Sequence, residues 1–267
     1  MDTNTIIDFD KYLLLAINGS DSLFWDGCMK VYTTIAVWIP LILVLVYMLI
    51  KNNGLKDFVL LFFSIVLVVV LTDVISSGFC KPFFQRWRPT NDPELMYLVD
   101  VVDNIRGGNY GFTSSHAANS FGIATFLLLL VKNRVLTVSL LFWASLNAYT
   151  RMYLGVHYPG DILAGTLIGV AVGCGMYALY RYIKKRQRHS HRDWISTQYT
   201  KTGYLVSDVY LFLIVMYGTF VAIPLISFFT FVYRYTNKGN HSSQKVAFNI
   251  CLSVCLVFTL RCQLCAG

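Results

Sequence analysis

The residues best suited to chemistry lie in the stretch Thr150–Asp161, which reads TRMYLGVHYPGD and separates two apolar runs. His157 and Asp161 are four residues apart, so a helix that begins near His157 brings both side chains onto one face. A carboxylate bonded to one ring nitrogen fixes the tautomer of a histidine and leaves the other nitrogen free to attack. Arg151 adds a planar guanidinium suited to phosphate oxygens. The alternative is a neutral histidine at a helix start that Asp161 caps.

A second polar stretch reads KPFFQRWRP and carries Lys81, followed seven residues later by Arg88 and then Pro89. Two fixed cations at the edge of a bilayer suit a phosphate group. The alternative is that they are snorkelling cations at a helix end, which are common. Arg86 fits that alternative better than Lys81 or Arg88 does.

A third stretch reads GFTSSH and ends in Ser114, Ser115 and His116, just before an apolar run. A serine at a helix start caps the helix, and the free backbone N–H groups of the first turn form an anion site. His116 falls in that first turn and can face the same anion. The sequence therefore predicts three polar stretches that share one anionic ligand.

The composition indicates which kind of chain must position these residues. Hydrophobic residues make up 56% of the 267 residues and charged residues 13%, and the apolar residues come in runs. Such runs favour a polytopic membrane protein over a large soluble core. The net charge of +8 then indicates orientation and contact with anionic lipids rather than nucleic-acid binding. A lone CxxC at Cys262 and Cys265 is weak support for a metal or redox site.

The apolar runs predict an all-α polytopic membrane helix bundle. The first segment, residues 6–30, has hydrophobic residues at helical spacing from Ile6 to Ile17, before a break at residues 18–20. It fits either an amphipathic helix on the membrane surface or an ordinary packed helix. The predicted spans are 31–50, 58–79, 117–131, a fourth that ends near 154, 160–183, 205–233 and the marginal 246–260.

Two features of these spans bear on packing and on the polar groups. Small residues in the span 160–183 permit close helix packing; they are Gly165, Gly169, Gly173 and Gly175. Asp73 lies within the apolar span 58–79, where we expect it to make a satisfied polar contact or to support a residue of the site.

The basic loops predict the orientation of the chain. Residues 51–56, 132–134 and 181–192 carry most of the lysines and arginines between spans, and the alternation of spans permits all three to share one face. That face is then cytoplasmic. The polar loop 80–111 and the stretches that hold His116 and His157 fall on the opposite, outer face, which is periplasmic in a Gram-negative bacterium.

Together the three stretches read Lys-x6-Arg-Pro, then Ser-x-His, then Arg-x5-His-x3-Asp. In this order they resemble the type 2 phosphatidic acid phosphatase (PAP2) superfamily, which also includes the vanadium haloperoxidases. The likeness covers roughly residues 10–183. Three positions depart from the usual motifs, since Thr113, Ser115 and Thr150 stand where the family usually has Pro, Gly and Ser.

The resemblance implies a fold and a location. It implies a six-helix core with extra hydrophobic segments at the C-terminus. Residues 1–183 would form this core together with an N-terminal amphipathic helix. Residues 184–267 would form a basic cytoplasmic loop and additional transmembrane segments. The protein would lie in a bacterial inner membrane, with its active site facing the periplasm.

The resemblance also implies roles for the ionisable residues. The residues that would bind the phosphate are Lys81, Arg88, Ser114, Ser115 and Arg151. His157, oriented by Asp161, would attack phosphorus and form a phosphohistidine. His116 would protonate the leaving oxygen and then help to activate water. No metal and no other cofactor is implied.

The expected function is metal-independent hydrolysis of a phosphate group from a membrane lipid, and the expected partners are this lipid and the bilayer. The chain looks like bacterial members of the family, with lipid A as the first candidate substrate. Undecaprenyl diphosphate, phosphatidylglycerol phosphate and phosphatidic acid are alternatives. Two other classes remain open, namely a lipid-binding or transport protein and a lipid phosphotransferase. The sequence leaves the oligomeric state undetermined.

Overall fold

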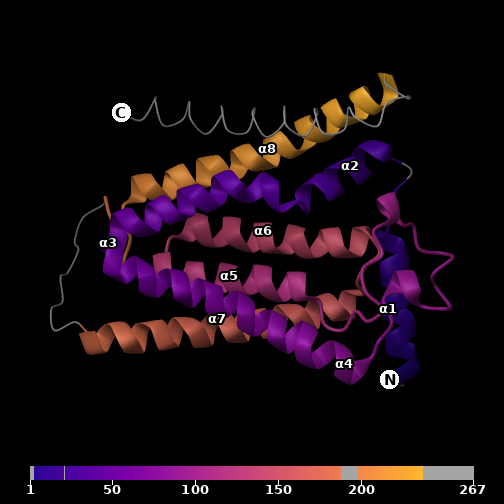
Figure 1. The fold of residues 1–267 in the computed structure, drawn as a ribbon, viewed down its shortest axis with the longest axis horizontal. Coiled ribbons are helices and arrows are strands. Elements are labelled where there is room, and N and C mark those ends of the chain that lie inside the picture. The colour runs from indigo at the N-terminus through magenta and orange to yellow at the C-terminus, as the bar shows by residue number, and fades with distance from the viewer. Residues whose placement is uncertain (1–2, 21, 188–197, 237–267) are drawn as a thin grey trace. The chain divides into compact units, whose positions relative to one another are not determined.

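The structure is a computed structural model that describes residues 3–20, 22–187 and 198–236 (Figure 1). All regular elements in these ranges are helices, and the two β-bridges among them are isolated. Among the described residues, three helices are long and apolar enough to cross a membrane, namely Ile35–Phe84, Pro159–Lys184 and Val206–Tyr233. The prediction of an all-α membrane protein is confirmed.

The chain divides into two compact units. The first comprises the described parts of residues 1–19 and 52–206, and the second those of residues 20–51 and 207–267. The predicted division at residues 183 and 184 stays a prediction. The predicted span 246–260 and the CxxC lie outside the described residues.

The second unit contains α2 (Leu23–Tyr32), the first arm of α3 (Ile35–Asp73) and nearly all of α8 (Val206–Thr236). Aromatic rings join them, since Tyr32 stacks on Phe220 with 6.3 Å between ring centroids. At the end of the arm of α3, Lys51 Nζ lies 2.8 Å from Asp208 Oδ1. The predicted span 31–50 therefore begins later than expected, because α2 ends at Tyr32 and a new helix starts at Ile35.

Gly54 is the break within α3. Its φ of 75° lies in the region that glycine adopts at little cost, and it is the one residue of α3 with non-helical dihedral angles. The predicted polar turn over residues 51–56 is thus almost entirely helical, and the change of direction is confined to Gly54.

The second arm of α3 belongs to the first unit and continues further than predicted. It passes into a π-helical segment, Val74–Cys80, and then into α4, Lys81–Phe84. The sequence placed the start of the polar loop at residue 80, but Lys81 lies on a helix. Segments of π-helix are frequent at functional sites. Here the segment leads directly into the first of the three polar stretches.

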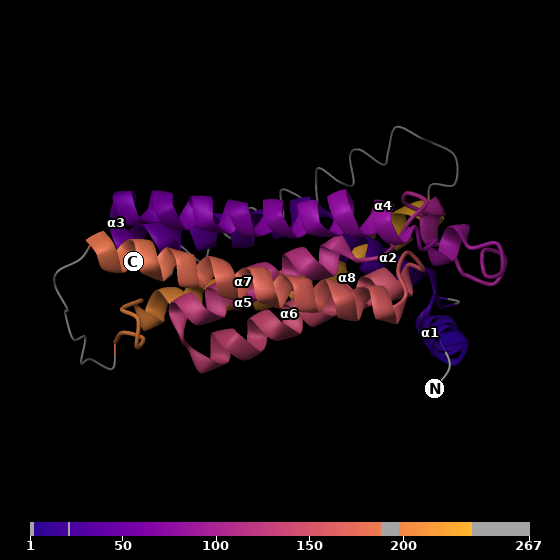
Figure 2. The same ribbon diagram turned by 90° about the horizontal axis from the view of Figure 1, so that it is seen from below.

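Three helices of the first unit run side by side, with α5 (Ser115–Val131) between α6 (Arg134–Tyr153) and α7 (Pro159–Gln187) (Figures 1 and 2). They match the third, fourth and fifth predicted spans. Because α6 runs antiparallel to its two neighbours, its end lies beside the starts of α5 and α7. Those three helix ends carry the predicted site.

Glycines on α7 allow it to approach α5 closely. A Cβ atom on Gly169 would lie 2.3 Å from the carbonyl oxygen of Ala118, and one on Gly173 would lie 2.6 Å from that of Gly122. Gly165 has the same relation to Ser114, at 2.5 Å. These three glycines are four residues apart and confirm the predicted close packing. The fourth, Gly175, has open space at its Cβ position.

The N-terminal helix α1 (Thr3–Ile17) lies across the ends of α6 and α7 (Figure 1). Leu14 is fully buried and packs against Leu95, Val99 and Tyr158. Large hydrophobic side chains remain exposed on the same helix, namely Ile6, Phe9 and Tyr12. The helix therefore packs against the core and also presents an apolar face, and its position on the membrane surface stays a prediction.

Candidate active site

A glycine turn between α6 and α7 places His157. Gly155 follows the end of α6 with a φ of 67°, a helix-ending conformation that favours glycine. The turn is closed by a bond from the Val156 N–H to the Arg151 carbonyl oxygen, at 3.1 Å. The chain then reverses, passes through His157 and enters α7 at Pro159. Arg151 and His157 are buried, and Asp161 has no exposed surface.

His157 and Asp161 meet as their spacing predicts, although α7 begins two residues later than assumed. The distance between His157 Nδ1 and Asp161 Oδ2 is 3.5 Å, slightly longer than an ordinary hydrogen bond. The same Oδ2 accepts the backbone N–H of Tyr158 at 3.1 Å. Asp161 therefore both faces the histidine and caps the start of α7, so the two interpretations of the sequence describe one carboxylate.

Arg88 lies on the opposite side of the imidazole ring. Its Nη1 atom is 3.3 Å from His157 Nε2 and 3.3 Å from the carbonyl oxygen of Val156, and its Nε donates to the carbonyl oxygen of Tyr110 at 3.2 Å. A guanidinium group can only donate, so Nε2 is the acceptor and carries a lone pair. The ring proton is then on Nδ1, facing Asp161.

The backbone around Arg88 is fixed by pairing with the far end of the polar loop. The Arg88 N–H donates to the carbonyl oxygen of Asn109, and the Gly111 N–H donates to that of Arg86, both at 2.9 Å. These bonds bring the first polar stretch next to the second, which begins at Gly111. Two segments separated by the whole loop thus meet at the start of α5.

Lys81 reaches the same helix start from α4. Its Nζ atom donates to Ser115 Oγ at 2.9 Å and to Ser77 Oγ at 2.8 Å. Ser77 Oγ lies 3.2 Å from Asp73 Oδ1. The π-helical segment thus supplies the hydroxyl that links Asp73 to Lys81, so Asp73 supports the site through one intervening residue.

Ser114 caps α5, as the sequence predicts. Its Oγ atom accepts the N–H of Ala117 at 3.4 Å, and its own N–H donates to the carbonyl oxygen of Asp161 at 3.1 Å. His116 follows in the first turn, with an exposed side chain. The start of α5 is therefore attached directly to the residue that faces His157.

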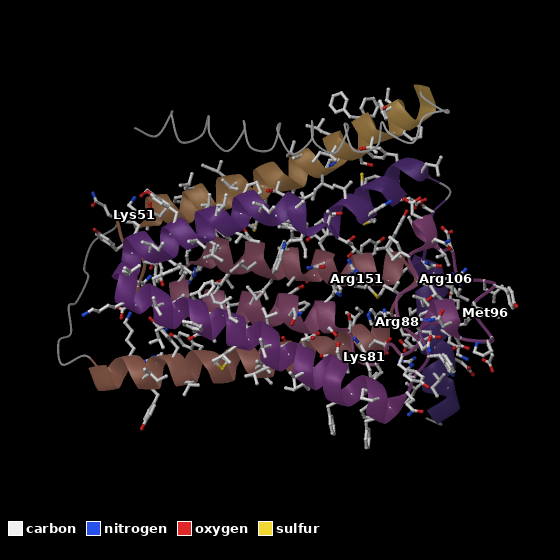
Figure 3. All side chains as sticks on the ribbon, in the orientation of Figure 1. Lys51, Lys81, Arg88, Met96, Arg106 and Arg151 are labelled. Atoms are coloured by element: carbon white, nitrogen blue, oxygen red, sulfur yellow. The ribbon has the colours of Figure 1, made fainter. Side chains whose placement is uncertain are left out.

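All eight predicted site residues lie at this end of the three helices. Figure 3 shows the three cationic residues of the set gathered there from separate elements: Lys81, Arg88 and Arg151. Ala117, Ala148 and Ile162 form the hydrophobic cluster that holds the three helix ends together. The arrangement can bind an anion with several cations and a helix start, and it can present a histidine lone pair to that anion.

Burial sets the protonation state of His157. Burial, with a smaller contribution from the charge of Arg88, lowers the pKa of the imidazole to about 4, against the opposing effect of Asp161. Burial likewise lowers the pKa of Arg88, against the attraction of Asp161. A neutral histidine is the form that can act as a nucleophile.

Arg86 and Asp10 lie behind the site, in contact with Asp161 and with each other, and the sequence did not reveal either of them. Arg86 was assigned to snorkelling cations, but its Nη1 atom donates to Asp161 Oδ1 at 2.9 Å and its Nη2 atom lies 2.6 Å from Asp10 Oδ2. The position of Arg86, two residues before Arg88 in the paired stretch, could have indicated a role. Asp10 gave no such signal, because it lies 76 residues from Arg86 in the sequence.

Within the described part of the chain, no group of three or more His, Cys, Asp or Glu side chains could hold a metal ion. The ionisable groups of the site are instead dominated by cations. They suit an anionic ligand.

Known proteins resemble this chain in sequence. It is 42% identical over 175 residues to a lipid A 4'-phosphatase of Bacteroides thetaiotaomicron, a match that covers 65% of this chain and 76% of the relative. A lipid A 4'-phosphatase of Porphyromonas gingivalis is 31% identical over 181 residues, with 68% and 77% covered. An undecaprenyl-diphosphatase of Sulfolobus acidocaldarius is 31% identical over 167 residues, with 61% and 74% covered.

The fold has a solved counterpart as well. A transmembrane PAP2-type phosphatidylglycerolphosphate phosphatase from Bacillus subtilis superimposes with a TM-score of 0.53. The match covers 71% of this chain and 90% of that structure, at 19% sequence identity. This likeness shows the shared fold.

Residues 57–185 match the PAP2 superfamily, and with these relatives the chain belongs to that superfamily. It is an integral membrane protein and a phosphatase, which confirms the resemblance seen in the sequence motifs. The matched range contains all eight predicted site residues.

Proposed function

We propose that this phosphatase removes a phosphate group from lipid A at the outer face of the bacterial inner membrane. Two relatives that are 42% and 31% identical are lipid A 4'-phosphatases, and each match covers about three quarters of the relative. The 4'-phosphate is therefore the proposed point of attack. The observation that carries the chemistry is the contact of Arg88 with His157 Nε2, since it places a cation beside the atom that would attack phosphorus.

In the proposed mechanism the phosphate binds among Lys81, Arg88 and Arg151, with Ser114 and Ser115 at the N-terminus of α5. The buried, neutral His157 holds its proton on Nδ1 toward Asp161 and directs the Nε2 lone pair at phosphorus. The cations stabilise the negative charge that spreads over the phosphoryl oxygens in the transition state.

The first step forms a bond between His157 Nε2 and phosphorus while the bond from phosphorus to the lipid oxygen breaks. Binding of the phosphate anion beside His116, in the first turn of α5, favours the protonated form of its imidazole, which donates its proton to the departing oxygen. In the second step His116 takes a proton from water, the water oxygen bonds to phosphorus, and the bond to Nε2 breaks. Phosphate leaves, and both histidines return to their starting states.

The proposed orientation is supported by the end of the unit opposite the site. The start of the second arm of α3 and the end of α7 meet there, where Asp57 and Lys184 pair at 3.3 Å. Val131 at the end of α5 lies there too, and its carbonyl oxygen accepts the hydroxyl of Thr202. The basic segments at 51–56, 132–134 and 181–187 thus adjoin one end. A cytoplasmic position for that end leaves the site outside.

A substrate panel tests the proposed function. The purified protein in detergent is given lipid A, undecaprenyl diphosphate, phosphatidylglycerol phosphate and phosphatidic acid, and released phosphate is measured with and without EDTA. We expect the highest kcat/KM on lipid A, loss of the 4'-phosphate by mass spectrometry, and no effect of EDTA. Transfer of phosphate to added alcohols in preference to water would instead indicate a phosphotransferase, and binding without turnover would indicate a lipid carrier.

A further inference from the structure

Asp161 is fully buried and uses both of its oxygens. Oδ2 faces His157 and accepts the Tyr158 N–H, while Oδ1 accepts Arg86 Nη1 at 2.9 Å. A buried carboxylate is stable only with charged or hydrogen-bonding partners. Because His157 is neutral at rest, Arg86 is the partner that always carries a compensating charge.

Arg86 is itself held from several sides. Its Nη2 atom lies 2.6 Å from Asp10 Oδ2, and its guanidinium carbon lies 4.1 Å from the centroid of the Tyr158 ring. Burial lowers the pKa of Arg86, but Asp161 and Asp10 outweigh this effect and raise it above the ordinary value. The guanidinium is therefore fixed in place and fully charged.

Asp10 connects Arg86 back to α7. Its Oδ1 atom accepts the N–H of Gly160 at 2.7 Å. A Cβ atom on Gly160 would lie 2.8 Å from Asp10 Oδ2, so a larger residue there would displace this carboxylate. The carboxylate of α1 thus touches both the arginine that holds Asp161 and the first turn of the helix that carries Asp161.

Helix α1 is also held in place by contacts that do not involve Asp10. Leu14 packs in a hydrophobic cluster one turn later. Asn18 Nδ2 donates to the carbonyl oxygens of Tyr153 and Asp100, at 2.9 and 3.0 Å, and its Oδ1 atom accepts the Asp100 N–H at 2.7 Å. Substitution of Asp10 should therefore leave α1 in place.

We infer that Arg86 and Asp10 are positioning residues, which clamp Oδ1 of Asp161 and so keep Oδ2 aimed at Nδ1 of His157. The inference rests on the proposed function, in which His157 attacks phosphorus. As the bond to Nε2 forms, the imidazole gains positive charge, and a carboxylate held in one orientation stabilises it. Neither Arg86 nor Asp10 contacts the site where the phosphate is proposed to bind. The clamp therefore acts on kcat.

The variants Arg86→Gln, Arg86→Lys and Asp10→Asn test the clamp, with Lys11→Gln as the matched control. Lys11 is the next residue on α1 and pairs with Glu94, away from Asp161. On lipid A and on p-nitrophenyl phosphate, we expect Arg86→Gln to lower kcat about 10- to 100-fold, by analogy with the outer partners that orient the imidazole of metal-binding histidines. KM stays unchanged, Arg86→Lys restores part of kcat, Asp10→Asn has a smaller effect, and Lys11→Gln matches wild type.

Two further readouts separate positioning from a merely structural role. In an Asp161→Asn background, Arg86→Gln should lower kcat little further, because the arginine acts through the carboxylate of Asp161. The acid limb of kcat/KM should also move to higher pH in Arg86→Gln, because a positive charge near the imidazole is lost while Arg88 and Asp161 remain. A reduced folded fraction would lower the profile without moving it.

Additive losses in the double variant, or a raised KM with unchanged kcat, overturn the clamp. So does a loss of activity that parallels the loss of folded protein in size-exclusion and thermal-unfolding measurements. An active His157→Ala variant overturns the proposed function itself. If His157→Ala is inactive and the double variant is additive, only the clamp is wrong.

Discussion

The two ends of the helices α5 to α7 differ in how deeply their charged side chains are buried and in how many partners those side chains have. At the site end, His157 and Asp161 are 2% and 0% exposed, and their neighbours fix them from several sides. At the other end, Lys184 and Asp57 pair at 3.3 Å with side chains that are 23% and 28% exposed. Buried charges are costly unless each has its partners, whereas exposed pairs contribute little.

This difference shows where the fold specifies geometry. At the site end, three segments that are distant in the sequence surround His157 and Asp161 and supply their partners. These segments are the polar loop, the start of α5 and helix α1. At the opposite end, the basic segments have to lie on the correct side of the membrane, but their side chains do not need a precise geometry. Substitutions should therefore matter most among the buried charges, less along the glycine contact between the two ends, and least at the exposed pair.

The largest expected effect is that of His157→Ala. It removes the proposed nucleophile, whose ring lies between Arg88 and Asp161. We expect no phosphate release from any lipid substrate and no covalent phosphoenzyme after acid quenching. Lys184→Gln, at the opposite end, is the control. Normal turnover in His157→Ala would show that the buried pair has only a structural role.

His116→Ala should have the next largest effect, and its size should depend on the substrate. General acid catalysis is typically worth about 10²- to 10⁴-fold, and we expect a loss of this order on lipid A. p-Nitrophenyl phosphate has an acidic leaving group and needs little protonation. His116→Ala should therefore retain a larger fraction of its kcat/KM on that ester, whereas His157→Ala is inactive on both.

Equal losses of His116→Ala on the two substrates would indicate that His116 only binds phosphate. The comparison uses ratios of kcat/KM because the two substrates bind differently. The same ratio measured for Lys184→Gln gives the reference.

Much of this end was predictable from sequence. The spacing of His157 and Asp161, the cap at Ser114 and the cations Lys81 and Arg88 are local patterns whose chemistry limits their roles. The glycine contact was predictable for the same reason, since a repeat of four residues places small side chains on one face.

The clamp was not predictable. Asp10 and Arg86 are 76 residues apart, and one sequence contains no signal that pairs them. From the sequence alone, an aspartate on an amphipathic helix and an arginine near a membrane are each expected to face solvent. The structure was also needed to show that a π-helical segment extends the helix to Lys81, because apolar periodicity does not distinguish a π-turn from the start of a loop.

The pH dependence probes the burial of His157. Because burial lowers its pKa to about 4, the imidazole stays neutral down to that pH, and the acid limb due to His157 should lie near pH 4 rather than 6.5. The buried neutral ring also contributes stability above about pH 6.5 that is lost as the pH falls toward 4. Measurement of kcat/KM and of thermal unfolding from pH 3.5 to 8 tests both, after correction for the ionisation of the substrate. A corrected limb at 6.5 would show that the ring is solvated.

Gly169→Ala tests the close contact of α7 with α5, which lies between the two ends of these helices. Its new Cβ atom would lie 2.3 Å from a backbone oxygen of α5, which cannot move aside as a flexible side chain can. Overpacking of this kind typically costs about 1–3 kcal/mol. Gly175→Ala is the matched control, because nothing lies within 4 Å of its Cβ position. We expect a lower Tm in detergent for Gly169→Ala alone, and equal Tm values for the two variants would show that α7 does not need this close approach.

The smallest expected effect is that of Lys184→Gln. Its pair with Asp57 is partly exposed, and Lys184 also donates to the hydroxyl of Tyr180, at 3.0 Å. Exposed pairs typically contribute about 0.2–1 kcal/mol, so the variant should unfold almost as wild type does and keep its kcat/KM. A double-mutant cycle with Asp57→Asn isolates the pair, because each single change also alters solvation. A coupling as large as that of Arg86 with Asp161 would mean that charge is held as tightly at this end as at the site. The low dielectric of the site would then not be what distinguishes the two ends.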